Sequence, residues 1–320
     1  MGLKIVLFGT GEFALPVFKR LICSETHEVV GVYTQPDRTG RGHHRHVNQV
    51  KELGQNHGIP VFQPLKVNSD EALNELRQLD ADIFVVAAYG QILKQEFLDI
   101  APMGAFNLHG SLLPRHRGAA PVQYSIWKGD REGGVTMFQI ERGLDSGPMI
   151  ANVATDIGPK ETSGDLMTRL AELSVDLTVT ALEELEAGRA QFVTQDESQV
   201  TLAPRIPKTA GVIDWNQSAE EIDCHVRAMQ PWPKASSELT CRDRKPLRCI
   251  LIDVDPVSEE TGRQPGSIQS TRGQVLVQTG KGCLKLNTIQ PAGKQAMNAA
   301  SFVNGYNLSD DASFGLAETA

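Results

Sequence analysis

The chain has 320 residues, of which 40% are hydrophobic and 22% are charged, and its formal net charge is −8. This composition is typical of a folded globular protein and excludes disordered and fibrous classes, while the length allows two domains with separate cores. The negative charge argues against broad, non-specific binding of nucleic acid, which needs a basic surface, and leaves room only for a local basic patch.

No apolar run approaches the roughly 18 residues that a membrane span requires, and the chain start leads into a strand pattern rather than into a signal peptide. The five cysteines are odd in number, widely spaced and without a C-x-x-C pair, which indicates neither disulfides nor zinc. We therefore expect a cytoplasmic protein with no membrane partner and no metal.

Strands and helices alternate through the first half of the chain. Apolar runs typical of buried strands alternate with segments of helical spacing. In chain order these are a strand at 3–8, a helix at 13–21, a strand at 29–34, a short strand at 61–62, a helix at 70–79 and a strand at 82–88. The alternation predicts an α/β domain, doubly wound and Rossmann-like, with a parallel sheet and helices on both faces.

The second half changes character after a long helix. That helix is expected over 162–187, with Ser163 as its cap, Gly188 at its end and one stripe of leucines: Leu166, Leu170, Leu173, Leu177, Leu182 and Leu185. Short alternating segments separated by Gly and Pro follow, a pattern that predicts a small, OB-like β-barrel. The expected organisation is a catalytic domain over 1–190, a linker over 191–209, the barrel over 210–308 and a frayed tail over 309–320.

The turn after the first strand, Gly9–Ala14, fits the pattern G-x-G-x-x-A of dinucleotide-binding proteins. Such proteins carry an acidic residue at the end of the second strand, where it holds the ribose. Here that strand ends in Tyr33–Pro36, without a carboxylate. We therefore expect no NAD, and interpret the glycines as permitting a tight turn between strand and helix.

Three polar residues lie at or near the ends of strand-like runs, where open α/β sheets place their chemistry: Asn107, His109 and Asp145. Asn107 and His109 alternate along one strand and so project from the same face. An amide and an imidazole aimed at one point can stabilise an oxyanion, and a carboxylate that folds back to the imidazole can set its tautomer and accept protons. Taken singly, each residue has a plain structural explanation as a turn cap, a satisfied histidine or a turn residue.

The longer context of these residues resembles a known family. The runs Phe106–Pro121, Gly133–Thr136 and Gly143–Gly147 are similar to the signature of folate-dependent formyltransferases. In that family the Asn, His and Asp serve formyl transfer, which implies that Asn107, His109 and Asp145 are catalytic. The family's folate pocket would correspond here to two loops: Tyr89-Gly90 and Ser111-Leu112-Leu113-Pro114.

Within the family, the chain resembles the enzymes that formylate methionyl-tRNA, from Phe8 to Met297. This resemblance implies 10-formyltetrahydrofolate as co-substrate, initiator Met-tRNA as partner, a role in translation initiation and a monomer. The Gly-containing basic loop 37–46 corresponds to a loop that contacts the tRNA acceptor arm, so the expected RNA contacts are Arg38, Arg41 and Arg45. The chain has Gly40-Arg41-Gly42-His43-His44 where two lysines are usual, which makes the loop's charge sensitive to pH.

Other interpretations stay open at this point. A further RNA-facing patch at Arg242, Arg244, Lys245 and Arg248 competes with a solvated rim. An amino-sugar nucleotide formyltransferase uses the same folate donor and is the main rival in function. A catalytically idle tRNA- or folate-binding module is disfavoured because Asn107, His109 and Asp145 are all present.

Overall fold

In a computed structural model, the described residues are 2–37, 48–241, 245–271, 274–308 and 311–315. They form two compact units. Unit 1 comprises Met1–Pro121, Glu132–Asp156 and Leu166–Pro204, and unit 2 comprises Val122–Arg131, Ile157–Asp165 and Arg205–Ala320. No helix in these ranges is long and apolar enough to cross a membrane.

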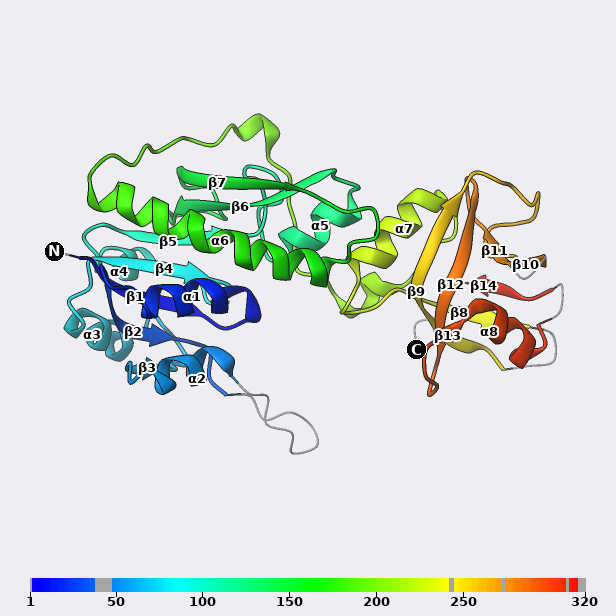
Figure 1. Ribbon diagram of the computed structural model, residues 1–320, viewed down its shortest axis with the longest axis horizontal. Helices are drawn as coiled ribbons and strands as arrows, with labels where there is room; N and C mark the ends of the chain where they lie inside the picture. Colours follow the sequence, from blue (N-terminus) through cyan, green and yellow to red (C-terminus); the bar gives the residue numbers. More distant parts are fainter. Residues whose placement is uncertain (1, 38–47, 242–244, 272–273, 309–310, 316–320) are drawn as a thin grey trace. The chain divides into compact units, whose positions relative to one another are not determined.

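Unit 1 is built on a seven-stranded sheet of order β3-β2-β1-β4-β5-β6-β7 (Figure 1). The five strands from β3 to β5 in this order are parallel, as predicted, whereas β6 and β7 run antiparallel to their neighbours. The strands are β1 (Lys4–Gly9), β2 (Glu28–Tyr33), β3 (Val61–Phe62), β4 (Ile83–Ala87), β5 (Ala105–His109), β6 (Glu132–Gln139) and β7 (Met149–Asp156).

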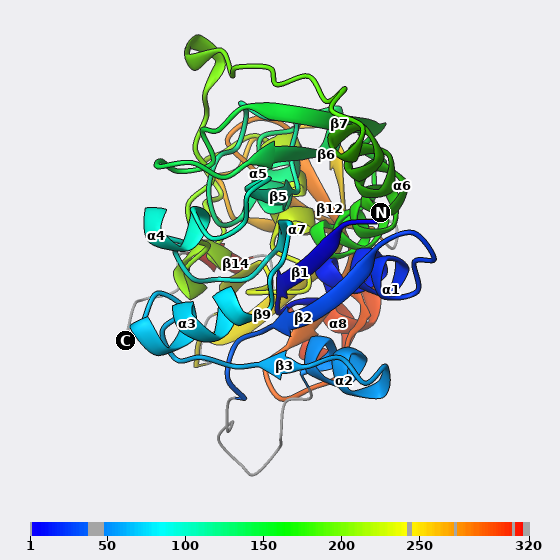
Figure 2. The ribbon, with the colours of Figure 1, turned by 90° about the vertical axis from the view of Figure 1, so that its left-hand side faces the viewer.

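Helices cover both faces of this sheet, which confirms the doubly wound prediction. In Figure 2, α1, α2 and α6 lie on one side of the strands, and α3 and α4 lie on the other. The helices are α1 (Leu15–Ile22), α2 (Gln49–Asn56), α3 (Asp70–Gln78), α4 (Gln95–Leu98) and α6 (Ser163–Glu186), with the short 3₁₀ turns η1 (Glu12–Ala14) and η2 (Glu197–Gln199). The central strands are apolar on both faces because helices pack on each.

The long helix α6 has the predicted extent, and its buried face contains four of the six leucines that were predicted for it. Leu166, Leu170, Leu182 and Leu185 are buried, whereas Leu173 and Leu177 are only half-buried. Ser174 and Thr178 take the buried positions between them. Their hydroxyls donate hydrogen bonds of 2.6 Å to carbonyl oxygens one turn earlier, so the burial leaves no hydroxyl unsatisfied.

The segment expected to be a linker is in large part a component of unit 1. Val193 exchanges backbone hydrogen bonds of 2.8 and 2.9 Å with Met149, and Ala203 donates to the carbonyl oxygen of Arg117 at 2.8 Å. The boundary therefore falls after Pro204 rather than at 190. This pairing could not be predicted from the sequence, because these residues pair through their backbone and carry mostly polar side chains.

Unit 2 is an antiparallel sheet of order β10-β11-β12-β9-β8-β14, to which β13 adds beside β12. Its strands are β8 (Ser236–Thr240), β9 (Leu247–Val257), β10 (Ile268–Thr271), β11 (Gln274–Gln278), β12 (Cys283–Pro291), β13 (Met297–Asn298) and β14 (Ser313–Gly315). The unit also contains α5 (Pro121–Trp127) after its first residue, α7 (Ala219–Ala228), α8 (Ala299–Tyr306) and the 3₁₀ turn η3 (Lys208–Gly211).

The two edges of the unit 2 sheet approach each other, which gives the nearly closed barrel that was predicted. Ile268 donates to Ala312 O at 3.1 Å, and Phe314 donates to Gly266 O at 2.8 Å. Gly266 has φ +89°, and a Cβ there would lie 2.1 Å from the carbonyl oxygen of Phe314, so only glycine fits. The tail predicted to be frayed from 309 therefore supplies β14, whose buried Phe314 stacks on Trp215.

Candidate active site

Strand β5 presents the first two candidate residues from inside the unit 1 sheet. Asn107 lies opposite Val86 of β4 and Phe138 of β6, and His109 lies opposite Thr136. The two side chains share one face because they are two residues apart on a strand. Asn107 is half-buried, and its carboxamide makes no hydrogen bond with the residues that the structure describes. Its N–H donors are thus available to a ligand.

His109 is 5% exposed and is held by one strong contact. Its Nε2 lies 2.9 Å from the carbonyl oxygen of His116. A carbonyl oxygen only accepts, so Nε2 carries the proton and Nδ1 is the open nitrogen of the neutral ring. Burial lowers the pKa of His109 below its ordinary value, against the opposing effects of the Asp145 charge and the His116 hydrogen bond. The ring is therefore neutral near pH 7.

Asp145 lies in the loop between β6 and β7 and faces His109. Its backbone has φ +49°, a conformation that few residues other than glycine, asparagine and aspartate adopt readily. Its Oδ2 accepts a 2.8 Å hydrogen bond from the backbone N–H of Gly118 and lies 3.8 Å from His109 Nδ1. That separation is too long for a hydrogen bond. The expectation that Asp145 sets the tautomer of His109 was thus wrong for this structure, because the carbonyl of His116 does so.

Thr136 of β6 fixes the loop after β5 through two hydrogen bonds to the loop backbone. Thr136 Oγ1 donates to the carbonyl oxygen of Ser111 at 2.8 Å and accepts from Leu113 N at 3.1 Å. The side chains of Ser111 and Leu113 are buried, and the Ser111 hydroxyl donates to Arg115 O at 2.7 Å. Of the four residues expected at a folate pocket in this loop, only Leu112 and Pro114 keep partly exposed side chains.

In the Tyr89-Gly90 turn after β4, the side chain of Tyr89 likewise points into the core of unit 1. The Tyr89 ring is 2% exposed and packs edge-on against Phe8 at 5.5 Å. The Tyr89 carbonyl oxygen accepts from Gln35 Nε2 at 2.9 Å, which ties this turn to the end of β2. Gly90 is exposed with φ +83°. What Tyr89 offers at the surface is therefore backbone rather than its phenol.

Together these groups suit acyl transfer. The amide of Asn107, which has no partner among the described residues, and the neutral imidazole of His109 project from the same face of β5, and the Asp145 carboxylate lies 3.8 Å from His109 Nδ1. The amide can stabilise an oxyanion, the imidazole can take a proton, and the carboxylate can stabilise the resulting imidazolium. The same set supplies no group that transfers electrons.

Models of protein families match both units of this chain. The model described as "Formyl transferase" matches residues 3–182, and the model described as "Formyl transferase, C-terminal domain" matches residues 205–307. The chain belongs to the formyl transferase family. The resemblance stated from the motifs is thereby confirmed at the level of both domains.

Curated relatives of this formyl transferase are similar over nearly their whole length. It is 42% identical to the methionyl-tRNA formyltransferase of Hydrogenovibrio crunogenus over 308 residues, which cover 96% of this chain and 97% of that protein. It is 40% identical to the methionyl-tRNA formyltransferase of Desulfotalea psychrophila, with 96% and 94% covered. Among solved structures, the sugar 3N-formyl transferase WlaRD is 17% identical with a TM-score of 0.66, covering 92% of this chain and 100% of that one, a likeness of fold alone.

Sequence reasoning missed the supporting residues of the formyl transferase site. His116 contributes its carbonyl oxygen and Gly118 its N–H, and backbone groups leave no mark in a side-chain pattern. Arg117 and Gln195 hydrogen bond to each other near Asp145 although 78 positions separate them. One signal was present: Arg117 lies inside the family motif, and an arginine buried there needs partners.

The residues predicted to contact RNA lie in two segments of this formyl transferase, 37–46 and 242–248. Arg38, Arg41 and Arg45, with the histidines beside them, lie outside the described residues, as do Arg242 and Arg244. Arg248 donates to the Ser236 hydroxyl at 3.3 and 3.2 Å, so its guanidinium is partly engaged within unit 2.

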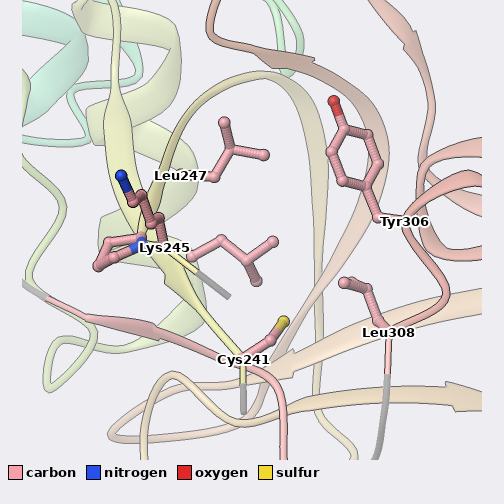
Figure 3. Close-up of a pocket in the computed structure, with 7 residues that line it drawn as sticks. Cys241, Lys245, Leu247, Tyr306 and Leu308 are labelled. Carbon is pink, nitrogen blue, oxygen red and sulfur yellow. The ribbon is translucent and has the colours of Figure 1, made fainter. Parts of the chain in front are cut away.

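Lys245 borders a small cavity in unit 2. The cavity measures about 260 Å³, and Tyr306 and Leu308 face Lys245 and Leu247 across it (Figure 3). Its walls are mainly aliphatic, and Lys245 supplies the positive charge at its rim. Of the expected basic patch, the structure describes Lys245 and Arg248, and both residues are exposed.

Proposed function

We propose that this protein transfers the formyl group of 10-formyltetrahydrofolate to the α-amino group of methionine on initiator Met-tRNA. The observation that carries the proposal is the identity of 42% and 40% to proteins named methionyl-tRNA formyltransferase, each over 96% of this chain. The match spans both units, so it includes the barrel as well as the unit that carries Asn107, His109 and Asp145. The product, formyl-methionyl-tRNA, is used in translation initiation. We therefore infer that the enzyme acts in the cytoplasm.

A folate donor is supported by the loops beside the trio. The partly exposed Leu112 and Pro114 and the exposed backbone at Gly90 offer apolar contact and backbone hydrogen-bonding groups, which suit a flat pterin ring. The fold relative WlaRD was solved in the presence of 5-N-formyl-THF. We assign the donor's ring to these two loops and its formyl group to the side of Asn107 and His109.

In the proposed mechanism, the neutral α-amine of methionine attacks the formyl carbon, and negative charge develops on the formyl oxygen. The Asn107 amide donates a hydrogen bond to this oxygen. The amine's proton passes to His109 Nδ1, and the imidazolium is stabilised by Asp145 Oδ2 at 3.8 Å and by the His116 carbonyl at 2.9 Å. As the bond from the formyl carbon to N10 breaks, that proton goes to N10, which leaves formyl-methionine on tRNA and tetrahydrofolate.

The rival acceptor is an amino-sugar nucleotide. Single-turnover formylation of charged initiator tRNA, compared with formylation of an amino-sugar nucleotide under the same folate concentration, separates the two. We expect rapid formylation of the tRNA and no measurable reaction of the sugar. Faster reaction of the sugar would overturn the proposal while leaving the folate assignment intact.

A further inference from the structure

The segment 193–203 contacts the candidate active site at two points. At one, Ala203 and Thr201 pair with Arg117 through backbone hydrogen bonds of 2.8 and 2.9 Å. At the other, the side chain of Gln195 reaches the loop that carries Asp145. All of these residues belong to unit 1. The segment thus borders both the 116–118 backbone, which holds His109 and Asp145, and the Asp145 loop itself.

Gln195 is 4% exposed, and its side-chain amide uses both of its N–H donors and its acceptor oxygen in hydrogen bonds. Its Nε2 donates to the carbonyl oxygens of Asp145 and Gly147, both at 2.8 Å. Its Oε1 accepts from Arg117 Nε at 3.0 Å and from Arg117 Nη2 at 2.8 Å. The orientation of the amide is fixed chemically, because Arg117 only donates and the two carbonyls only accept.

Arg117 is itself buried, with 6% of its surface exposed, and its charge is paired with the carboxylate of Glu197 at the surface. Its guanidinium donates to Glu197 Oε1 at 2.7 Å and Oε2 at 3.3 Å, and the Glu197 side chain is 72% exposed. The buried guanidinium is held in a fixed position, because moving away from either Gln195 or Glu197 would leave N–H donors of a buried charge without an acceptor. Arg117 therefore provides a rigid support that sets the plane and direction of the Gln195 amide.

The Asp145 backbone is held at both of its ends. Its φ of +49° lies in the left-handed region, which aspartate adopts more readily than most residues but still less readily than the right-handed regions, so contacts on both sides help to hold it there. The Gly118 N–H fixes the carboxylate end, whereas the Gln195 amide fixes the carbonyl end. With both ends held, Oδ2 stays opposite His109 Nδ1. With only one end held, the loop can relax and carry the carboxylate away.

We propose that Gln195, oriented by Arg117, is a positioning residue that holds Asp145 opposite His109 for formyl transfer. Gln195 touches no reacting atom, and its effect passes through the Asp145 backbone. The inference rests on the proposed function for its kinetic consequences. Its structural consequence, the placement of a carboxylate beside His109, does not depend on which amine is formylated.

The test uses Gln195→Met, which keeps the length of the side chain and removes the donors and the acceptor of the amide. Gln191→Met is the control, because Gln191 is exposed and lies four residues before Gln195. We expect Gln195→Met to lower single-turnover formylation per folded molecule on the order of 100-fold, as about 1 Å of misplacement does, with the KM for the folate unchanged. Gln191→Met should match wild type. Wild-type turnover per folded molecule in Gln195→Met would overturn the proposal.

A second readout needs no substrate. The Asp145 charge raises the pKa of His109, while burial and the His116 ring lower it. If Gln195→Met lets Asp145 move away, NMR titration of labelled histidine should show the His109 pKa below its wild-type value, with the signal identified by its loss in His109→Asn. An unchanged pKa would overturn the positioning role. Failure of wild type to formylate Met-tRNA would overturn the proposed function instead and leave this titration informative.

A third variant covers the case in which Gln195→Met does not fold. Arg117→Lys keeps the buried charge but offers a single nitrogen, which cannot serve Gln195 Oε1 and Glu197 as the guanidinium does. We expect lower turnover per folded molecule and the same downward movement of the His109 pKa. Unchanged values of both quantities in Arg117→Lys would contradict the proposal.

Discussion

The Nε2 atom of His109 donates a hydrogen bond to the carbonyl oxygen of His116, 2.9 Å away. The two residues are seven positions apart, and the chain between them forms the loop that follows β5. This contact leaves Nδ1 as the nitrogen that faces Asp145, with Oδ2 of that residue 3.8 Å away. The reactive nitrogen of the ring is thus selected by a backbone carbonyl rather than by the carboxylate.

The pKa of His109 should lie below the ordinary value of 6.5, because burial is the largest of its perturbations. The unfolded chain then binds the proton more readily than the folded one. Folding stability should consequently decrease as pH falls from about 6.5 through the native pKa of this group. Histidine NMR titration of the folded enzyme checks the prediction, and a His109 pKa above 6.5 would contradict it.

Asn107→Ala and His109→Ala should each lower turnover by roughly 100- to 1000-fold, the loss seen when one oxyanion donor or proton-transfer group is removed. The matched control is Asn152→Ala, an exposed asparagine on β7 of the same sheet. Single-turnover formylation and thermal unfolding are measured together. Near wild-type turnover in either site variant would remove that residue from the mechanism.

Asp145→Asn should lower turnover as much or more. The amide keeps the shape and cannot stabilise the imidazolium. Because the lost charge is one that raises the pKa of His109, the same variant should lower that pKa further. Asp176→Asn, an exposed change on α6, serves as the control. A raised His109 pKa in Asp145→Asn would show that the carboxylate does not act on the ring as its 3.8 Å separation implies.

Ligand binding separates the folate and dinucleotide interpretations. A ligand that binds only the native state raises its thermal stability, by about 2.7 kcal/mol at a hundred times its Kd. We expect stabilisation by a formyltetrahydrofolate analogue and none by NAD(H) or NADP(H), since the run Tyr33-Thr34-Gln35-Pro36 at the end of the second strand carries no carboxylate. Stabilisation by the dinucleotides alone would restore an oxidoreductase interpretation.

Arg41→Ala should weaken tRNA binding and reduce its salt dependence by about one unit of slope, because one phosphate contact is lost. Folate binding should not change. Arg20→Ala, an exposed arginine on α1, removes the same charge elsewhere in unit 1 and is the control. If Arg41→Ala binds and formylates tRNA normally, recognition lies elsewhere, with Lys245 the next residue to replace.

The sequence alone determined the doubly wound first unit, the barrel and the membership of a formyltransferase family. These follow from local patterns that are visible in the sequence, namely apolar periodicity, glycine-rich turns and the run Phe106–Pro121. Alternation along a strand also placed Asn107 and His109 on one face whatever the rest of the fold does, and the resemblance to the family made these two residues and Asp145 the catalytic candidates.

The tertiary structure alone decided how those candidates are held. The carbonyl of His116 and the N–H of Gly118 act through the backbone, which every residue has, so no side-chain pattern marks them. Gln195 lies in a polar stretch that predicts a linker, and its burial against Arg117 arises from a contact across 78 positions. Local sequence does not encode such pairings, because they form only when distant segments pack together and bring buried donors and acceptors within reach of each other.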